Sequence, residues 1–208
     1  VQINARNNEE FEKLFSENSS KIISYFLKAE QNRLRLNYNK LYEKSVFNRL
    51  EERFSIYLKV APGFSVTTEK KDFAWIRYET PEISQAVMIY TFPYTSDSTF
   101  TLKYLIQKRD SFLRANVPGP AKGSYMVTES MTEPVFGIIR HRGNYAADIR
   151  GLWRVENDFM GGPFINYTFV DRKNNMVIGL DGYVYAPNIS KYDYLKQVQA
   201  ILLSFRFA

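Results

Sequence analysis

The spacing of apolar residues changes from a helical to a strand-like period near Phe54. Between residues 19 and 52, apolar side chains recur every three to five positions, as they do on one face of a helix. Asn7 is a suitable cap for an earlier short helix that begins at Glu9. Residues 18–20 offer a second cap, so the pattern predicts two successive helices before the first strand.

The second of these predicted helices is unusually long. A continuous helix over residues 19–52 would span about 50 Å, because each residue adds 1.5 Å. That length exceeds the diameter of a small domain. We therefore expect either a break near residues 37–39, with two packed helices, or a helix that projects toward a partner.

Beyond Phe54 the pattern alternates, which is typical of half-buried strands. Antiparallel strands that are followed by a helix pack that helix across a face of the sheet. The sequence therefore predicts an α+β fold, with an antiparallel β-sheet and helices packed mainly on one face. The expected strands cover residues 54–60, 73–78, 86–92, 125–128, 135–140, 151–155, 164–170 and 176–185, and further helices reach Leu113 and Leu202.

The order of elements suggests an internal duplication of strands followed by a helix. Ile89–Phe92 precede Pro93 and a helix, and Gly182–Tyr185 precede Pro187 and another helix. We therefore divide the chain into an N-terminal helical segment over residues 1–53 and two β-rich repeats. The repeats cover residues 54–120 and 121–208 and are expected to form one compact domain. Because the chain begins with Val, we expect residues 1–53 to belong to a longer precursor.

Composition excludes several kinds of chemistry. The 208 residues include no Cys and one His, which excludes disulfides, thiolate metal sites, cysteine nucleophiles and multi-histidine metal centres. We expect no metal and no cofactor. The net charge of +6 divides into +2 over each of residues 1–54, 55–120 and 121–208. Nucleic-acid binders usually concentrate basic residues on one face, so nucleic acid is not an expected partner.

No recognised catalytic motif is present, and we predict no catalytic residue. His141 is flanked by Arg140 and Arg142, which disfavour the imidazolium that a catalytic base must form. The alternative for His141 is a surface histidine at the end of a strand. Two carboxylate pairs remain candidates for glycoside hydrolysis. They are Glu129 with Glu133, and Glu156 with Asp158.

The candidate binding residues lie in the second half of the chain. Three arginines surround the predicted turn at residues 143–145, where guanidinium groups could bind phosphate or carboxylate. Gly161-Gly162-Pro163 forces an unusual backbone path beside large apolar side chains. This segment is either a ligand-facing loop with an aromatic wall or a bulged corner that closes the sheet edge. The candidate ligand-binding residues are Arg140, Arg142, Arg150, Trp153, Asp158, Phe159, Gly161 and Gly162.

The same segment carries a family resemblance. The run from Arg150 to Phe164, RGLWRVENDFMGGPF, resembles the signature of an uncharacterised family of Bacteroidetes envelope lipoproteins, the domain-of-unknown-function family 4837. Residues 73–80 and 182–187 are similar to other stretches of that family. The resemblance implies an extracytoplasmic protein, in the periplasm or at the outer membrane surface. It also implies a lipid anchor outside this sequence, and it brings no activity, cofactor or catalytic residue.

These observations favour a non-catalytic domain that binds a protein or glycan partner at the cell envelope. One alternative is a carboxylate-based hydrolase that acts on envelope glycans. A nucleic-acid binder is a further alternative, which the even charge distribution disfavours.

Overall fold

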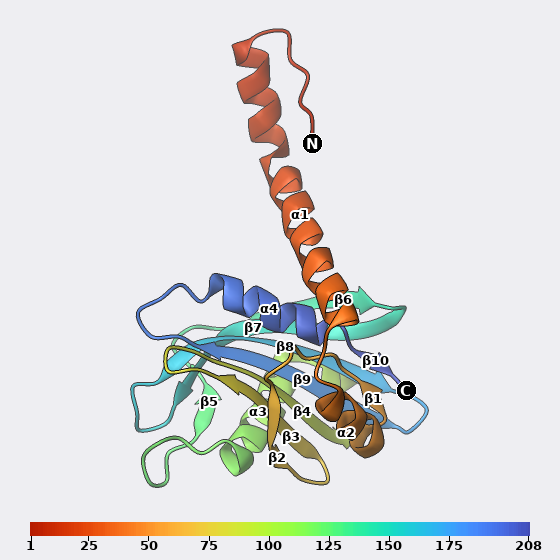
Figure 1. Cartoon of the computed structure of the whole chain (residues 1–208), viewed down its shortest axis with the longest axis vertical. Helices are drawn as coiled ribbons and strands as arrows, with labels where there is room; N and C mark the ends of the chain where they lie inside the picture. Colours follow the sequence, from red (N-terminus) through yellow and green to blue (C-terminus); the bar gives the residue numbers. More distant parts are fainter.

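The computed structural model describes residues 1–208 as an α+β fold around one curled antiparallel sheet (Figure 1). Eight strands form this sheet in the order β2-β3-β4-β9-β8-β7-β5, and β6 also pairs with β7. The strands are β2 (Ser65–Glu69), β3 (Phe73–Glu79), β4 (Ser84–Pro93), β5 (Met126–Thr128), β6 (Val135–His141), β7 (Asn144–Val155), β8 (Gly161–Asp171) and β9 (Met176–Tyr185). Two short strands, β1 (Ile56–Tyr57) and β10 (Arg206–Phe207), pair separately.

Helices cover both faces of the sheet, with more of them on one face. Helices α2 (Lys44–Phe54) and α4 (Tyr192–Leu202) pack on one side, which we call the α4 face. Helix α3 (Leu102–Asn116) follows a 3-10 turn, η1 (Asp97–Phe100), and packs on the opposite side, the α3 face. The α+β class and the antiparallel sheet are confirmed. The structure adds that α3 covers the second face.

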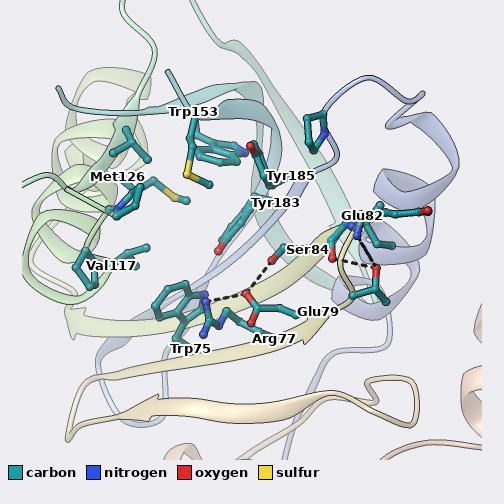
Figure 2. Close-up of a pocket in the computed structure, with 18 of the residues that line it drawn as sticks. Trp75, Arg77, Glu79, Glu82, Ser84, Val117, Met126, Trp153, Tyr183 and Tyr185 are labelled. Atoms are coloured by element: carbon teal, nitrogen blue, oxygen red, sulfur yellow. Dashed lines mark hydrogen bonds and ion pairs between the residues drawn. The ribbon is translucent and has the colours of Figure 1, made fainter. Parts of the chain in front are cut away.

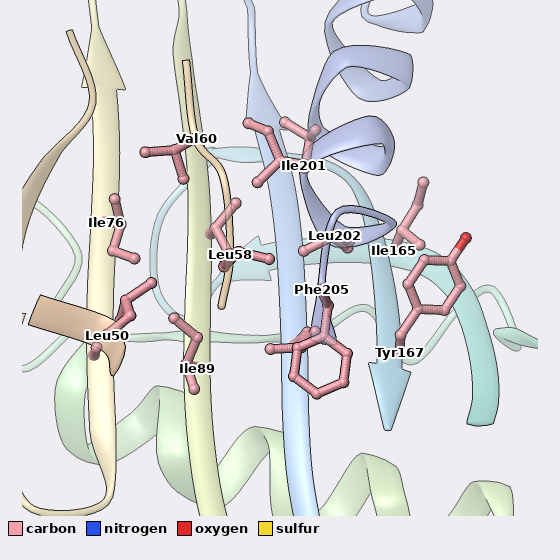
Figure 3. Packing of buried hydrophobic residues seen from close by; sticks show 14 of the residues in the cluster. Leu50, Leu58, Val60, Ile76, Ile89, Ile165, Tyr167, Ile201, Leu202 and Phe205 are labelled. Atoms are coloured by element: carbon pink, nitrogen blue, oxygen red, sulfur yellow. The ribbon is translucent and has the colours of Figure 1, made fainter. Parts of the chain in front are cut away.

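The α4 face carries the larger apolar core (Figure 3). Alternate residues of the strands, such as Ile76 and Ile89, share this core with Leu50 of α2 and with Ile201 and Leu202 of α4. Residues 54–60 were expected to form a strand, but only residues 56 and 57 pair with another strand. The alternation has a different cause, because Ile56, Leu58 and Val60 all point into this core from an extended segment.

The two strand-and-helix units meet at the centre of the sheet, where β4 pairs with β9. Units related by rotation about the sheet normal would place their helices on the same face. Helix α3 follows β4 onto one face, whereas α4 follows β9 onto the other. The predicted order of elements therefore recurs without this two-fold arrangement, and strands from both halves form one continuous sheet.

The N-terminal helix α1 (Asn8–Lys40) is continuous and stands away from the sheet (Figure 1). Asn7 caps it as predicted, since its side chain accepts a hydrogen bond from the backbone N–H of Glu10. The expected second cap at residues 18–20 is wrong, because Asn18 and Ser19 bond back to carbonyls within the helix. The helix ends at Lys40 and α2 follows, so the predicted break occurs a few residues late. The other alternative, a helix that projects from the domain, also applies, because most of α1 extends away from the sheet (Figure 1).

A buried ion pair lies between α3 and the sheet. Arg109 is 1% exposed and donates from Nε to Asp181 Oδ2 at 2.7 Å and from Nη2 to Oδ1 at 3.1 Å. Its Nη1 donates to Thr128 Oγ1 at 2.8 Å, and its guanidinium lies 3.7 Å from the centre of the Phe164 ring. Asn166 donates to the same carboxylate at 3.1 Å. This network joins α3, β5, β8 and β9.

Candidate functional site

A pocket with an aromatic wall opens on the α3 face and holds about 450 Å³ (Figure 2). Trp75 comes from β3, Trp153 from β7, and Tyr183 and Tyr185 from β9. These strands are not consecutive in the chain, and antiparallel pairing brings their alternate residues to one face. The remaining wall comes from the β3–β4 turn, the segment after α3 and Met160.

The aromatic side chains pack edge to face around Trp153. Its ring centre lies 5.1 Å from that of Tyr183, with an interplanar angle of 62°, and 6.2 Å from that of Tyr185. Such tilted contacts are the preferred arrangement of aromatic pairs. Trp153 and Tyr183 are almost fully buried, whereas Tyr185 is partly exposed. The pocket therefore has a fixed aromatic inner wall and a more accessible tyrosine.

Gly162 explains how Trp153 fits. The two residues are opposite each other in the β7–β8 ladder. A Cβ on Gly162 would lie 2.2 Å from the backbone oxygen of Val184 and 3.1 Å from Trp153 Nε1. Only glycine leaves room for the indole against the strand. The paired glycines thus support the pocket wall rather than forming a loop, since β8 begins at Gly161.

Both indole N–H groups of the pocket lack an ordinary hydrogen bond. Trp153 Nε1 and Trp75 Nε1 are buried and have no acceptor. Trp75 lies beside the Tyr183 hydroxyl, without forming a hydrogen bond of normal geometry. Burial is the main reason that the pKa of Tyr183 lies well above its usual value, so its hydroxyl stays protonated. Because buried donors are normally satisfied, the two indoles are an unusual feature of the pocket wall.

The polar groups of the pocket are largely paired with one another. The Arg77 guanidinium lies 4.2 Å from the centre of the Trp75 ring, and its Nη1 is 2.8 Å from Glu79 Oε1. Ser84 donates to the same carboxylate oxygen at 3.5 Å. Figure 2 shows these contacts at one side of the aromatic wall. Glu82 adds a second, exposed carboxylate to the lining, so the pocket offers a ligand one paired cationic donor and two carboxylate acceptors.

The structure separates most of the residues that the sequence suggested as a site. Trp153 lines the pocket and Gly162 supports it. The carboxylate of Asp158 accepts from the backbone N–H groups of Phe159 and Met160, which places Asp158 in a turn. Phe159 is fully exposed and lies outside the pocket lining, whereas its neighbour Met160 is part of that lining.

The three candidate arginines do not converge. Arg150 binds Asp148 through two nitrogens and also donates to the Tyr167 hydroxyl, on the α4 face. Arg142 occupies the β6–β7 turn with a φ of 51°. Arg140 lines a different pocket, of about 1010 Å³, with the turns at that end of the sheet. The three arginines therefore do not form a single anion site.

The remaining chemical candidates also have structural partners. His141 is a strand-end residue as expected but it is buried, and its Nε2 is 3.0 Å from the Phe205 backbone oxygen. Arg154 pairs with Glu156 at 2.7 Å and with Glu129 at 3.8 Å. The two acids that come together are thus from different predicted pairs. No group of three acidic or histidine side chains is arranged to hold a metal ion.

Sequence reasoning missed Arg77, Tyr183 and Tyr185 as pocket residues. A signal for them was present, because residues 73–80 and 182–187 carried the family resemblance together with the segment that contains Trp153. What was missing was the β4–β9 pairing, which brings β3 and β7 to two sides of one pocket.

Comparison with known protein families identifies one family model that matches this chain. The model for "Domain of unknown function (DUF4837)" matches residues 43–204. The chain belongs to the DUF4837 family. This match includes the pocket and begins directly after α1. No curated protein matches the chain, and no helix has the length and apolar character needed to cross a membrane.

Solved structures show remote similarity to this DUF4837 protein. The Ran-binding protein Mog1p of Saccharomyces cerevisiae has a TM-score of 0.43 and 9% identity, and the match covers 74% of this chain and 90% of that one. A point mutant of Mog1 gives a TM-score of 0.42 with the same identity and coverage. A protein from Bacteroides thetaiotaomicron gives 0.38 and 8% identity, over 74% and 45% of the chains. Similarity at this level carries no functional argument.

Proposed function

We propose that this DUF4837 domain is a non-catalytic binding module whose aromatic pocket takes an uncharged, hydroxyl-rich ligand such as a pyranose sugar. The observation that carries the proposal is the aromatic wall of the pocket, in which the buried indole N–H of Trp153 has no acceptor. A ligand hydroxyl oxygen that reaches this N–H after a small shift of the wall would accept from it and remove the cost of leaving it unpaired.

The rest of the pocket supports this ligand class. Its volume of about 450 Å³ falls in the usual range for small-molecule sites. Aromatic walls suit the apolar C–H faces of a sugar ring, and hydroxyl groups can both donate to Glu79 and accept from Arg77. Because Arg77 is paired with Glu79, an anionic ligand has no unopposed cationic partner there.

The cellular setting is part of the same proposal. The resemblance to envelope lipoproteins supports an extracytoplasmic, lipid-anchored location, where surface glycans are available as ligands. Fractionation of the full-length protein in its native host, with and without inhibition of lipoprotein processing, tests this placement. Recovery in the cytoplasm under both conditions would contradict it.

Titration calorimetry with cellobiose and chitobiose tests the pocket, with an alanine–proline tetrapeptide as a comparison ligand. Trp153→Phe keeps an aromatic ring but removes the N–H donor. We expect it to weaken sugar binding by roughly 2–10-fold, since one hydrogen bond contributes about 0.5–1.5 kcal/mol. Phe159→Ala is the matched control, because this fully exposed residue lies outside the pocket and its loss should leave affinity unchanged.

Binding of neither disaccharide would overturn the proposed ligand class, and binding of the tetrapeptide alone would assign the pocket to peptides instead. Equal sugar affinity in Trp153→Phe and the unchanged protein would show that the unpaired indole does not contact the ligand.

A further inference from the structure

The first two-thirds of α1 is a helix without a partner in this chain. No residue of α1 is buried. Its polar contacts with the body lie farther along, where Glu30 meets Lys196 at 2.5 Å and Gln31 donates to Gln199 at 2.9 Å. Helices in proteins gain most of their stability from packing an apolar face rather than from intrinsic propensity, and the free part of α1 has no such packing in this chain. The free part therefore needs a packing partner.

An apolar stripe runs along this free part. Phe11, Phe15, Ile22 and Phe26 are separated by four, seven and four residues, which keeps them on one helix face. The three phenylalanines are 45–58% exposed. The chain start, Val1–Asn4, folds back against Leu14, Ile22 and Tyr25, so it covers part of the stripe at Ile22 and leaves the three phenylalanines exposed. Figure 1 shows this segment beside the far end of α1.

The separations between the stripe residues, four, seven and four, read the same from either end of the helix. In an antiparallel pair centred between residues 18 and 19, Phe11 of one copy lies opposite Phe26 of the other, and Phe15 lies opposite Ile22. The small polar residues Asn18 and Ser19 occupy the centre. A parallel pair would also align the apolar residues, so spacing alone does not choose between the two orientations.

The charge distribution along α1 favours the antiparallel orientation. Residues 8–18 contain four Glu and one Lys, a net charge of −3. Residues 19–29 contain two Lys and no acidic residue, a net charge of +2. Antiparallel alignment places the acidic half of each helix against the basic half of its partner, whereas parallel alignment places like charges together.

We infer that α1 is a dimerisation helix and that its partner is α1 of a second copy, paired antiparallel over residues 8–29. The overlap ends before residues 30 and 31, which contact α4, so the two bodies lie at opposite ends of the helix pair. Phe11, Phe15, Tyr25 and Phe26 of both copies would bury roughly 600–1,000 Å², if each aromatic contributes about half of its 150–250 Å². Neighbouring side chains add to this area, which approaches the ~1,000 Å² expected of a specific interface.

Sedimentation velocity across micromolar concentrations tests the dimer. We expect the unchanged protein to reach twice its monomer mass of 24.4 kDa. Replacing Phe11, Phe15 and Phe26 together by Ser should raise the dissociation constant at least tenfold and leave the melting of the body unchanged. Met131→Ser is the control, since this side chain is 92% exposed but does not belong to α1.

Cysteine cross-linking tests the orientation, because the chain has no native thiol. A mixture of Glu12→Cys and Phe26→Cys chains should form a mixed disulfide. Glu12→Cys chains alone should not, since antiparallel pairing separates the two copies of residue 12 by about 20 Å at 1.5 Å per residue. A monomer at every concentration, or binding of α1 to lipid vesicles without dimerisation, would overturn the inference. Self-linkage of Glu12→Cys would overturn the antiparallel arrangement.

Discussion

Replacing Arg109 by Met tests how the buried ion pair contributes to stability. Arg109 and Asp181 are essentially unexposed, and the guanidinium supplies two of the three donors that the carboxylate receives. Met fills much of the same space but supplies no donor. In the variant, Asp181 would keep only its bond from Asn166.

The expected cost follows from this loss of partners. Removing one member of a buried pair leaves an uncompensated charge and typically costs about 3–5 kcal/mol. For a chain of this length each kcal/mol lowers the melting temperature by roughly 2–4 °C, so we expect a decrease of about 6–20 °C. The double variant Arg109→Met/Asp181→Leu has no buried charge at this position. It should be more stable than the single variant, because apolar replacement of a whole pair is often neutral.

Urea unfolding followed by tryptophan fluorescence measures the free energy of unfolding of four proteins. They are the unchanged protein, Arg109→Met, Asp181→Leu and the double variant, which together form a double-mutant cycle. The slope with urea should stay constant while the midpoint falls, as expected for a change in stability alone. A double variant that loses as much as the two single variants together would refute the reasoning, because it would show no coupling between the two charges.

Three further predictions concern packing and pH. Gly182→Ala would place a Cβ 2.3 Å from Val198 Cγ1 on α4 and should cost about 1–3 kcal/mol, whereas Gly137→Ala meets nothing within 4 Å and should show no such loss in the same urea assay. Burial, opposed by the Phe205 hydrogen bond, lowers the pKa of His141, so stability should fall as pH drops below about 6.5, and His141→Gln should reduce this dependence. Burial raises the pKa of Tyr38 to about 12. The unfolded chain therefore loses this proton first, and stability should fall from about pH 10 upward, less steeply in Tyr38→Phe.

Local patterns predicted much of the fold. The strand predicted over residues 176–185 has the bounds of β9, and Asn7 predicted the start of α1. The strand predicted over residues 54–60 was mostly wrong, because alternate burial does not require a strand partner. Leu58 and Val60 point into the core from unpaired backbone. The long α1 could not be distinguished from two helices, since Asn18 and Ser19 can cap a helix or bond back within one.

Only part of the candidate site could be predicted from the sequence. Trp153 and Gly162 were found because a large aromatic and a glycine pair are conspicuous in one segment. Arg150 was misplaced because neighbouring residues of a strand point to opposite faces, and it lies on the face away from Trp153. Identifying Trp75 and Tyr183 as its pocket partners required the pairing of strands from both halves of the chain.

The pairing of β1 with β10 has a consequence for how this domain forms. It joins Ile56 to Phe207, and Ala208 donates its backbone N–H to Ser55. The central pairing of β4 with β9 also connects segments about 90 residues apart in the chain. Contacts between such distant segments slow folding, because a large loop must close before they form. We therefore expect the sheet to remain incomplete during synthesis until β9 and β10 have left the ribosome, and the domain to fold as one unit rather than in successive halves.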